Sequence, residues 1–212
     1  HAEVEPSVSV NPSNPDNLIG AWQQDRWSNG AARGLSSGVS LDGGKTWTQS
    51  LIPFSRCSGG TRFNGGNYER ATDPWVTFSP NGTAYVMALA LNRTANSQNA
   101  MLASRSTDGG LTWDTPVSLI VDPDGIAFFN DKNSITADPT DSNLVYAVWD
   151  RLASNGNGPT YFARTINGGL SWETARSIYN PGGTGQTIGN VITVLPDGTL
   201  VNLLTKIVTI AG

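Results

Sequence analysis

The chain alternates polar and apolar residues in short segments that are separated by turn residues. The segment 4–10 (VEPSVSV) alternates in this way and is closed by Asn-Pro-Ser-Asn-Pro at 11–15. Similar segments follow at about 18–24, at 34–39 and at 47–52. A period of two, interrupted by Pro, Gly and Asn, predicts antiparallel β-strands joined by tight turns. No part of the chain has the 3.6-residue period of a long amphipathic helix.

The same succession returns three more times along the chain. Turn prolines follow the first strand of each unit at Pro12, Pro80, Pro139 and Pro196, with spacings of 68, 59 and 57 residues. The stretch 53–68 between the first two units is polar and rich in glycine, so we expect a loop there. The pattern predicts one domain over residues 1–212, with four-stranded units at about 4–52, 70–120 and 131–178 and an incomplete unit at 188–212.

An eight-residue motif marks the same point in three of the units. It reads SLDGGKTW at 40–47, STDGGLTW at 106–113 and TINGGLSW at 165–172. The third residue of each copy can accept hydrogen bonds from backbone N–H groups two or three residues on, and the glycines can adopt positive φ. We therefore expect structural turns, each followed by a tryptophan that packs into the sheet. The residues expected to have this structural role are Asp42, Asp108, Asn167, Trp47, Trp113 and Trp172.

This motif, Ser-x-Asp-x-Gly-x-Thr-Trp, resembles the Asp-box (BNR) repeat of sialidase-like β-propellers, and the strand pattern around it covers most of the chain. The resemblance implies an all-β β-propeller of four-stranded antiparallel blades, with the boxes on the face away from the binding site. At about 60 residues per blade, the sequence accounts for about three and a half blades of an expected six. The resemblance thus implies that the rest of a longer chain, or a second copy, completes the ring beside the edge at 200–207.

Charged residues gather where the innermost strands are expected to begin, at Glu5, Asp73 and Asp131, and where the second strands end. Antiparallel order places both sets at one rim, where paired carboxylates can share acid and base roles on a glycosidic bond and arginine can bind a carboxylate. A solvated rim held by salt bridges is the alternative interpretation. The candidate acids are Glu69, Asp73, Asp131, Asp25 and Asp150, and the candidate substrate-binding residues are Arg26, Arg93, Arg151, Tyr68 and Trp27.

The resemblance implies a sialidase-like glycoside hydrolase that acts on a glycan at this rim. The alternative is a non-catalytic propeller that binds carbohydrate or protein. Sialidases of this family begin the first innermost strand with an arginine of an arginine triad, whereas this chain has Glu5-Pro6 there. The family's tyrosine nucleophile and its glutamate partner belong to blades beyond these residues. The resemblance therefore covers the architecture and does not extend to specificity for sialic acid.

Composition narrows the classes of partner. Thirteen Lys and Arg against 17 Asp and Glu give a net charge of −4 and no basic surface for nucleic acid, and no apolar run approaches the about 20 residues of a membrane span. Cys57 is alone and is expected to be a loop thiol, and His1 has no second histidine for a metal site. Asp122, Asp124 and Asp131 lack the spacing of a calcium loop and are expected to form turns. No metal or cofactor is predicted, and the resemblance implies a secreted or cell-surface protein.

Overall fold

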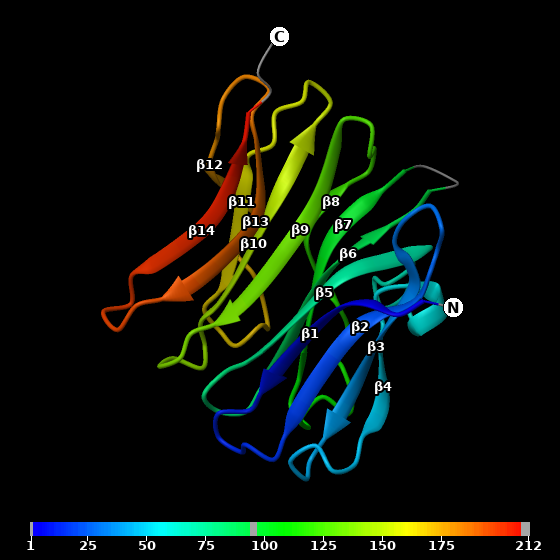
Figure 1. Ribbon diagram of the computed structural model, residues 1–212, viewed down its shortest axis with the longest axis vertical. Coiled ribbons are helices and arrows are strands. Elements are labelled where there is room, and N and C mark those ends of the chain that lie inside the picture. The colour runs from blue at the N-terminus through cyan, green and yellow to red at the C-terminus, as the bar shows by residue number, and fades with distance from the viewer. Residues whose placement is uncertain (1, 94–96, 209–212) are drawn as a thin grey trace.

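The computed structural model describes residues 2–93 and 97–208 and consists almost entirely of antiparallel β-strands (Figure 1). The all-β class predicted from the alternation is confirmed. In chain order the elements are β1 (Val4–Val10), β2 (Leu18–Arg26), β3 (Ala32–Ser40), β4 (Thr48–Ile52), the 3-10 helix η1 (Arg56–Ser58), β5 (Arg70–Phe78), β6 (Ala84–Leu91), β7 (Asn99–Ser106), β8 (Val117–Asp122), β9 (Phe128–Ala137), β10 (Val145–Ala153), β11 (Thr160–Thr165), β12 (Arg176–Tyr179), β13 (Gln186–Val194) and β14 (Leu200–Ile207).

Strands that are consecutive in the sequence pair with one another. The groups β1–β4 and β5–β8 each pair in order, and a single bridge between Ala32 and Ala71 joins them into one eight-stranded sheet. Strands β9–β12 form a four-stranded sheet, and β13 and β14 form a two-stranded sheet. The first strands of the groups, β1, β5, β9 and β13, are neighbours, and Figure 1 shows the groups side by side. Among the described strands, no sheet closes on itself.

Apolar side chains fill the spaces between neighbouring groups. The first cluster joins β1–β4 to β5–β8 and contains the fully buried Ile19, Leu35 and Phe54. The second cluster joins β5–β8 to β9–β12 and is centred on Trp149, which is also fully buried. A third, smaller cluster joins β10 and β11 to Ile192 of β13. Each group is thus stabilised mainly by burial against its neighbours, because an isolated sheet of this size has no core of its own.

The innermost strands are linked by hydroxyl groups. Ser7 Oγ accepts a hydrogen bond from the backbone N–H of Val76 at 3.1 Å, and Ser134 Oγ donates to the carbonyl of Asn190 at 2.8 Å. The predicted alternation of β1 is present, but its valines face outward, and Val8 is 69 % exposed. Serine faces inward instead, because the narrow space between innermost strands accepts a small polar side chain that satisfies the neighbouring backbone.

Each innermost strand contains a β-bulge near its start, where the pairing register shifts by one or more residues. The bulged residue has a left-handed backbone, with φ of 54° at Glu5, 54° at Asp73, 45° at Lys132 and 68° at Gly189. The prediction that these strands begin at the bulges is wrong, since β5 already begins at Arg70. A bulge interrupts the alternation of side chains without ending the strand.

The motif turns share one hydrogen-bond pattern. Asp42 accepts the Thr46 backbone N–H at 2.9 Å and the Thr46 hydroxyl at 2.6 Å. The Ser40 hydroxyl donates to Asp42 at 2.8 Å and accepts the N–H of Gly44 at 2.8 Å. The second copy repeats these bonds, and in the third the amide oxygen of Asn167 accepts the equivalent backbone N–H at 3.0 Å. The acceptor therefore reaches the N–H four residues on, and not two or three as expected from Asx-turn geometry.

Two of the motif tryptophans lie against the strand group that precedes their own. Trp113 packs on the first cluster and donates its indole N–H to Ser37 Oγ at 3.3 Å, and Trp172 packs on the second cluster. Trp47 is 52 % exposed, lies over Gly38 of β3 and donates to the carbonyl of Gly44 at 3.0 Å. Trp47 therefore packs on its own sheet and is only partly covered, because no described strand group precedes the first one.

Replacing Asp42 with Ala is expected to lower the melting temperature and to leave ligand binding unchanged, because two donors of Thr46 and the Ser40 hydroxyl lose their acceptor. The Thr46 hydroxyl is the main cause that holds the pKa of Asp42 at about 2. The contribution of Asp42 is thus present above its unfolded pKa and is lost as the pH falls towards 2. Thermal unfolding at pH 7 tests this, with Asp42→Asn as the milder control, since Asn167 builds the same turn. An Asp42→Ala protein as stable as the parent would contradict it.

Candidate functional site

Side chains from three strand groups meet at the bulges. Lys132 Nζ lies 3.2 Å from Asp73 Oδ2 and 3.6 Å from Glu5 Oε1. A bulge redirects its side chain away from the alternation of the strand. Left-handed backbone is uncommon at residues other than glycine and clusters at functional sites. The structure thus brings together one ammonium and two carboxyl groups that are far apart in the sequence, and we call them the bulge cluster.

Three polar side chains around the bulge cluster fix the positions of its acids. Gln23, which is 1 % exposed, donates from Nε2 to Glu5 Oε2 and to Thr72 Oγ1, the latter at 2.6 Å. The Thr72 hydroxyl donates in turn to Asp73 Oδ1 at 2.7 Å. Asn133, which follows the third bulge, donates to the backbone carbonyl of Asp73 at 3.1 Å. These contacts hold both carboxyl groups in one orientation, as a reaction site requires.

The pKa values of the two acids of the bulge cluster are shifted in opposite directions. A hydrogen bond with Asp73 raises the pKa of Glu5, and burial and the negative charge of Asp73 raise it further. Burial acts to raise the pKa of Asp73, but the hydrogen bonds from Glu5 and Thr72 and the charge of Lys132 outweigh it and leave that pKa below its usual value. The surroundings thus favour the protonated form of Glu5 and the ionised form of Asp73, each relative to the free side chain.

Two further acids lie beyond the cluster on β9 and β10. Asp131 and Asp150 are directly opposite each other in the β9–β10 pairing. Burial, followed by the negative charge of Asp73, raises the pKa of Asp131 to about 6. Burial, followed by the negative charge of Asp131, raises the pKa of Asp150 to about 8. Asp150 is only 2 % exposed, so it is protonated at neutral pH.

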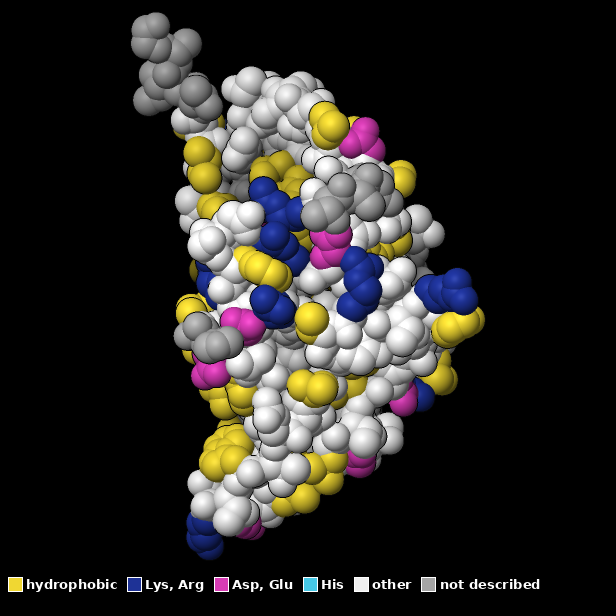
Figure 2. All heavy atoms as spheres, turned by 90° about the vertical axis from the view of Figure 1, so that its right-hand side faces the viewer, with side chains coloured by type: hydrophobic (Ala, Val, Ile, Leu, Met, Phe, Trp, Pro, Cys, Tyr) yellow, Lys and Arg dark blue, Asp and Glu magenta, His cyan; other side chains and the backbone are white. Residues whose placement is uncertain are grey.

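A cavity of about 190 Å³ lies beside the bulge cluster. This is below the about 300–1,000 Å³ of ordinary ligand pockets, so it admits one small ring or the end of a longer chain. Figure 2 shows the right-hand side of the molecule as seen in Figure 1, with Lys and Arg side chains gathered near the middle and Asp and Glu side chains beside them. The charged residues that line the cavity are the acids Glu5, Asp73 and Asp131 and the bases Arg26, Arg93 and Lys132.

Two of the predicted acids are bound to arginines outside the lining of this cavity. Asp25 Oδ2 lies 2.9 Å from Arg33 Nε within the first strand group. Glu69 Oε2 accepts the backbone N–H of Arg93 at 2.6 Å, and its Oε1 lies 3.7 Å from Arg56 Nη2. The structure therefore gathers Asp73 and Asp131, with Asp150 behind them, and leaves Asp25 and Glu69 apart.

Arg151 does not line the cavity with Arg26 and Arg93. Its guanidinium binds both carboxylate oxygens of Asp122, with 3.0 Å from Nε to Oδ2, and lies 3.7 Å from the ring centroid of Phe128. Asp122 is a buried strand residue, so its assignment to a turn is wrong, as is that of Asp131 in β9. Asp124 does form a turn, in which its Oδ1 accepts the Ile126 N–H at 2.8 Å.

The two aromatic residues that are predicted to bind substrate differ in their accessibility. Tyr68 is 6 % exposed and belongs to the first apolar cluster, so its ring is not available to stack on a sugar. Trp27 is 37 % exposed, and its ring lies 4.3 Å from the guanidinium carbon of Arg33 and 5.0 Å from that of Arg70. These cation–π contacts occupy the ring of Trp27 with the protein's own side chains.

Lys132 is not among the residues predicted to form the site. Its position in the repeat could have identified it, because Lys132 occupies the same place in its unit as Glu5 and Asp73 in theirs. Among residues 2–93 and 97–208, no group of three His, Cys, Asp or Glu side chains is arranged to hold a metal ion. In that same part of the chain, no helix is long and apolar enough to cross a membrane. Cys57 is an exposed free thiol, and His1 lies outside the described residues.

No family model and no curated protein matches this chain, so the Asp-box assignment stays a prediction. Solved structures do match it. The Hadza microbial sialidase Hz136 aligns with a TM-score of 0.62 at 16 % identity, over 97 % of this chain and 44 % of its own. The α-L-arabinanase of Penicillium chrysogenum in complex with arabinobiose aligns with a TM-score of 0.62 at 16 % identity, over 94 % and 57 %.

The α-L-arabinofuranosidase of Fusarium graminearum aligns with a TM-score of 0.65 at 15 % identity, over 94 % of this chain and 56 % of its own. This chain thus spans about half the length of these proteins. At such low identity the alignments establish the fold alone. The chain therefore has an all-β, propeller-like fold that is similar to that of sialidases and arabinanases, which are β-propeller glycoside hydrolases.

Proposed function

We propose that this chain forms blades of a β-propeller glycoside hydrolase and that the cavity beside the bulge cluster is its reaction site. The observation that carries the proposal is that Glu5, Asp73 and Asp131, from three strand groups, line one cavity, where their surroundings separate their pKa values. The pKa of Asp73 is lowered, whereas burial and the charge of Asp73 raise that of Asp131 to about 6. Acids whose environments separate their pKa values can divide the roles of acid and base. The similarity of the fold to those of glycoside hydrolases supports this proposal.

Hydrogen bonds connect both Glu5 and Asp131 to Asp73, so the three acids form one connected unit. Asp131 is the member whose raised pKa suits a general acid.

In the proposed reaction the protonated carboxyl of Asp131 gives its proton to the glycosidic oxygen. The bond from that oxygen to the anomeric carbon breaks, and the leaving group departs as an alcohol. The Asp73 carboxylate stabilises the positive charge that develops on the sugar ring. Water supplies the hydroxyl group to the anomeric carbon, and the proton that it releases restores the carboxyl of Asp131.

The bonds that the arginines of the cavity already make favour a neutral sugar. Three acids and three bases line the cavity. Arg26 and Arg93 each already donate to a backbone carbonyl, of Trp27 at 3.1 Å and of Asn29 at 2.8 Å. An arginine triad for a sugar carboxylate would need a third member, and Arg151 is bound to Asp122 instead. We therefore infer a neutral glycan as the substrate.

Hydrolysis of aryl glycosides tests the proposal. We expect release of the aryl alcohol from a neutral glycoside, such as an aryl α-L-arabinofuranoside, and less from an aryl sialoside. The rate should fall as the pH rises through about 6, because Asp131 loses its proton, and should fall at acid pH below the usual range of Asp73. Binding of arabinobiose with no turnover of any glycoside between pH 3 and 9 would refute hydrolysis and favour a carbohydrate-binding propeller.

A further inference from the structure

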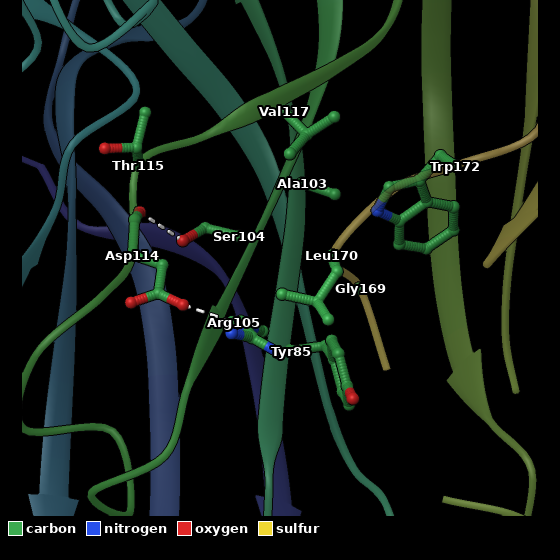
Figure 3. A pocket seen from close by; sticks show the side chains of 10 residues that line it. All are labelled: Tyr85, Ala103, Ser104, Arg105, Asp114, Thr115, Val117, Gly169, Leu170 and Trp172. Carbon is green, nitrogen blue, oxygen red and sulfur yellow. Dashed lines mark hydrogen bonds and ion pairs between the residues drawn. The ribbon is translucent and has the colours of Figure 1, made fainter. Parts of the chain in front are cut away.

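A second cavity, of about 300 Å³, lies between β5–β8 and the third motif turn (Figure 3). We call it the junction cavity. It is at the other end of the strands from the bulge cluster. Tyr85 lines the junction cavity and Leu91, six residues further along β6, lines the first cavity, which corresponds to about 20 Å at about 3.3 Å per residue. The proposed hydrolysis makes no use of this space.

We call the contact between β1–β4 and the second motif turn the first junction, and the contact between β5–β8 and the third motif turn the second junction. The first junction is packed where the second contains the junction cavity. At the first junction, Gly110 of the second motif turn lies against Ile19 and Val39, which are 0 % and 2 % exposed. At the second junction, Gly169 of the third turn lies against Tyr85 and Arg105. A packed apolar contact is thus replaced by two long polar side chains, and a space opens beside them.

Two hydrogen bonds of the first junction have no equivalent at the second. Trp113 donates its indole N–H to Ser37, whereas the corresponding position on β7 is Ala103, so Trp172 has no such acceptor. Figure 3 shows the indole nitrogen of Trp172 on the side of the ring that faces Ala103. Ser50, which pairs with Ser37, donates to the carbonyl of Leu111 at 2.9 Å, whereas the residue that pairs with Ala103 is Val117, whose side chain has no donor.

A charged pair completes the lining. Arg105 Nε donates to Asp114 Oδ2 at 2.8 Å, and its Nη1 donates to the Gly168 carbonyl at 3.1 Å. Among the described residues no partner binds Nη2, and the Asp114 side chain is 57 % exposed. Leu170, which is 66 % exposed, adds an apolar surface. The cavity thus offers donors and acceptors side by side with no net charge.

We propose that the junction cavity is a second carbohydrate site, which binds a neutral saccharide through adjacent hydroxyl groups. Each sugar hydroxyl both donates and accepts, and so matches the neighbouring Arg105, Asp114 and indole N–H groups, while the C–H face of the ring packs on Leu170. An anionic ligand is disfavoured because Asp114 cancels the charge of Arg105. The proposal does not depend on hydrolysis at the bulge cluster.

Titration of the ¹⁵N-labelled protein with arabinobiose tests the site. The chain has seven tryptophans, and Trp172→Phe identifies the indole N–H signal of Trp172. We expect that signal to shift and to saturate. Ala103→Ser should weaken binding at least tenfold, because its hydroxyl takes the indole N–H as Ser37 does at the first junction. Ser37→Ala is the matched control and should leave the affinity unchanged within twofold.

Two results would overturn the proposal. One is a Trp172 signal that does not move with arabinobiose or xylotriose at millimolar concentration. The other is a larger response to N-acetylneuraminic acid than to either neutral sugar. If Ala103→Ser does not fold, Arg105→Gln should weaken binding at least fivefold, and unchanged affinity in that variant would also contradict the site.

Discussion

Replacing Asp150 with Asn is expected to stabilise the protein, and by more as the pH rises. Burial is the main cause that raises the pKa of Asp150 to about 8, and the negative charge of Asp131 adds to it. In the unfolded chain an aspartate titrates near about 3.9. Between these values the folded state keeps a proton that the unfolded state releases, so stability is highest below about pH 4 and is lost as the pH rises towards 8.

The size of this effect follows from the difference between pH 7 and the pKa of an aspartate in the unfolded chain. Each pKa unit corresponds to about 1.4 kcal/mol, so keeping Asp150 protonated lowers the free energy of unfolding by about 4 kcal/mol at pH 7. Asparagine has the same shape and no charge, and Asp150 Oδ1 has no hydrogen-bond partner among the described residues that the change would break. We expect Asp150→Asn to gain about 2–4 kcal/mol at pH 7–8 and almost nothing at pH 4.

Urea unfolding at pH 4, 6 and 8 measures this gain. The exposed Asp16 provides the control, since Asp16→Asn should leave the free energy of unfolding within about 0.5 kcal/mol of the parent at each pH. A gain for Asp150→Asn that is the same at pH 4 and pH 8 would show that the side chain is not protonated in the folded protein.

Replacing Asp131 with Asn is expected to lower the hydrolysis rate by about 10²–10⁴-fold, the usual contribution of a positioned general acid. The amide keeps the size of the side chain and has no proton to give to the glycosidic oxygen. The loss should appear in kcat, with KM nearly unchanged, because the sugar still fills the same cavity. The decline of the rate above about pH 6 should disappear in this variant, since the pKa of Asp131 sets it.

The matched control is Asp25→Asn, because Asp25 is paired with Arg33 outside the lining of the cavity. Its kcat should stay within about twofold of the parent's. Melting temperatures of both variants establish that they are folded. If Asp25→Asn is inactive and Asp131→Asn is not, the acid is wrongly assigned, and the cavity beside the bulge cluster is not the reaction site.

Much of the fold follows from local sequence patterns. Alternating residues predict the all-β class, and the motif residues of each turn hydrogen bond to one another within five positions, as at Ser40 and Thr46 around Asp42. Such contacts depend only on residues that are close in sequence. The prediction that Tyr68 binds substrate fails because its position depends on distant residues. Its loop has a polar, glycine-rich sequence, but long-range packing places the ring in the first apolar cluster with Phe54.

The site could be predicted only in part, because its contacts are distant in sequence. Glu5, Asp73 and Lys132 come from three strand groups, and their ion pairs have no local pattern. The rule that one rim gathers the charged ends of strands does identify Asp73 and Asp131. It does not distinguish them from Asp25, because whether a carboxylate faces the cavity or a neighbouring arginine depends on the orientation of its side chain.

The bulges also make the centre of this fold easy to diversify. Each strand group presents one residue there whose side chain lies outside the alternation that packs the core. A carboxylate, a second carboxylate and an ammonium occupy the first three positions, and the fourth is Gly189, where a Cβ would meet nothing within 4 Å. Left-handed φ favours Gly, Asn and Asp at such positions. A change among the residue types that tolerate this backbone can therefore alter the charge at the centre of the fold while the β-sheets keep their packing.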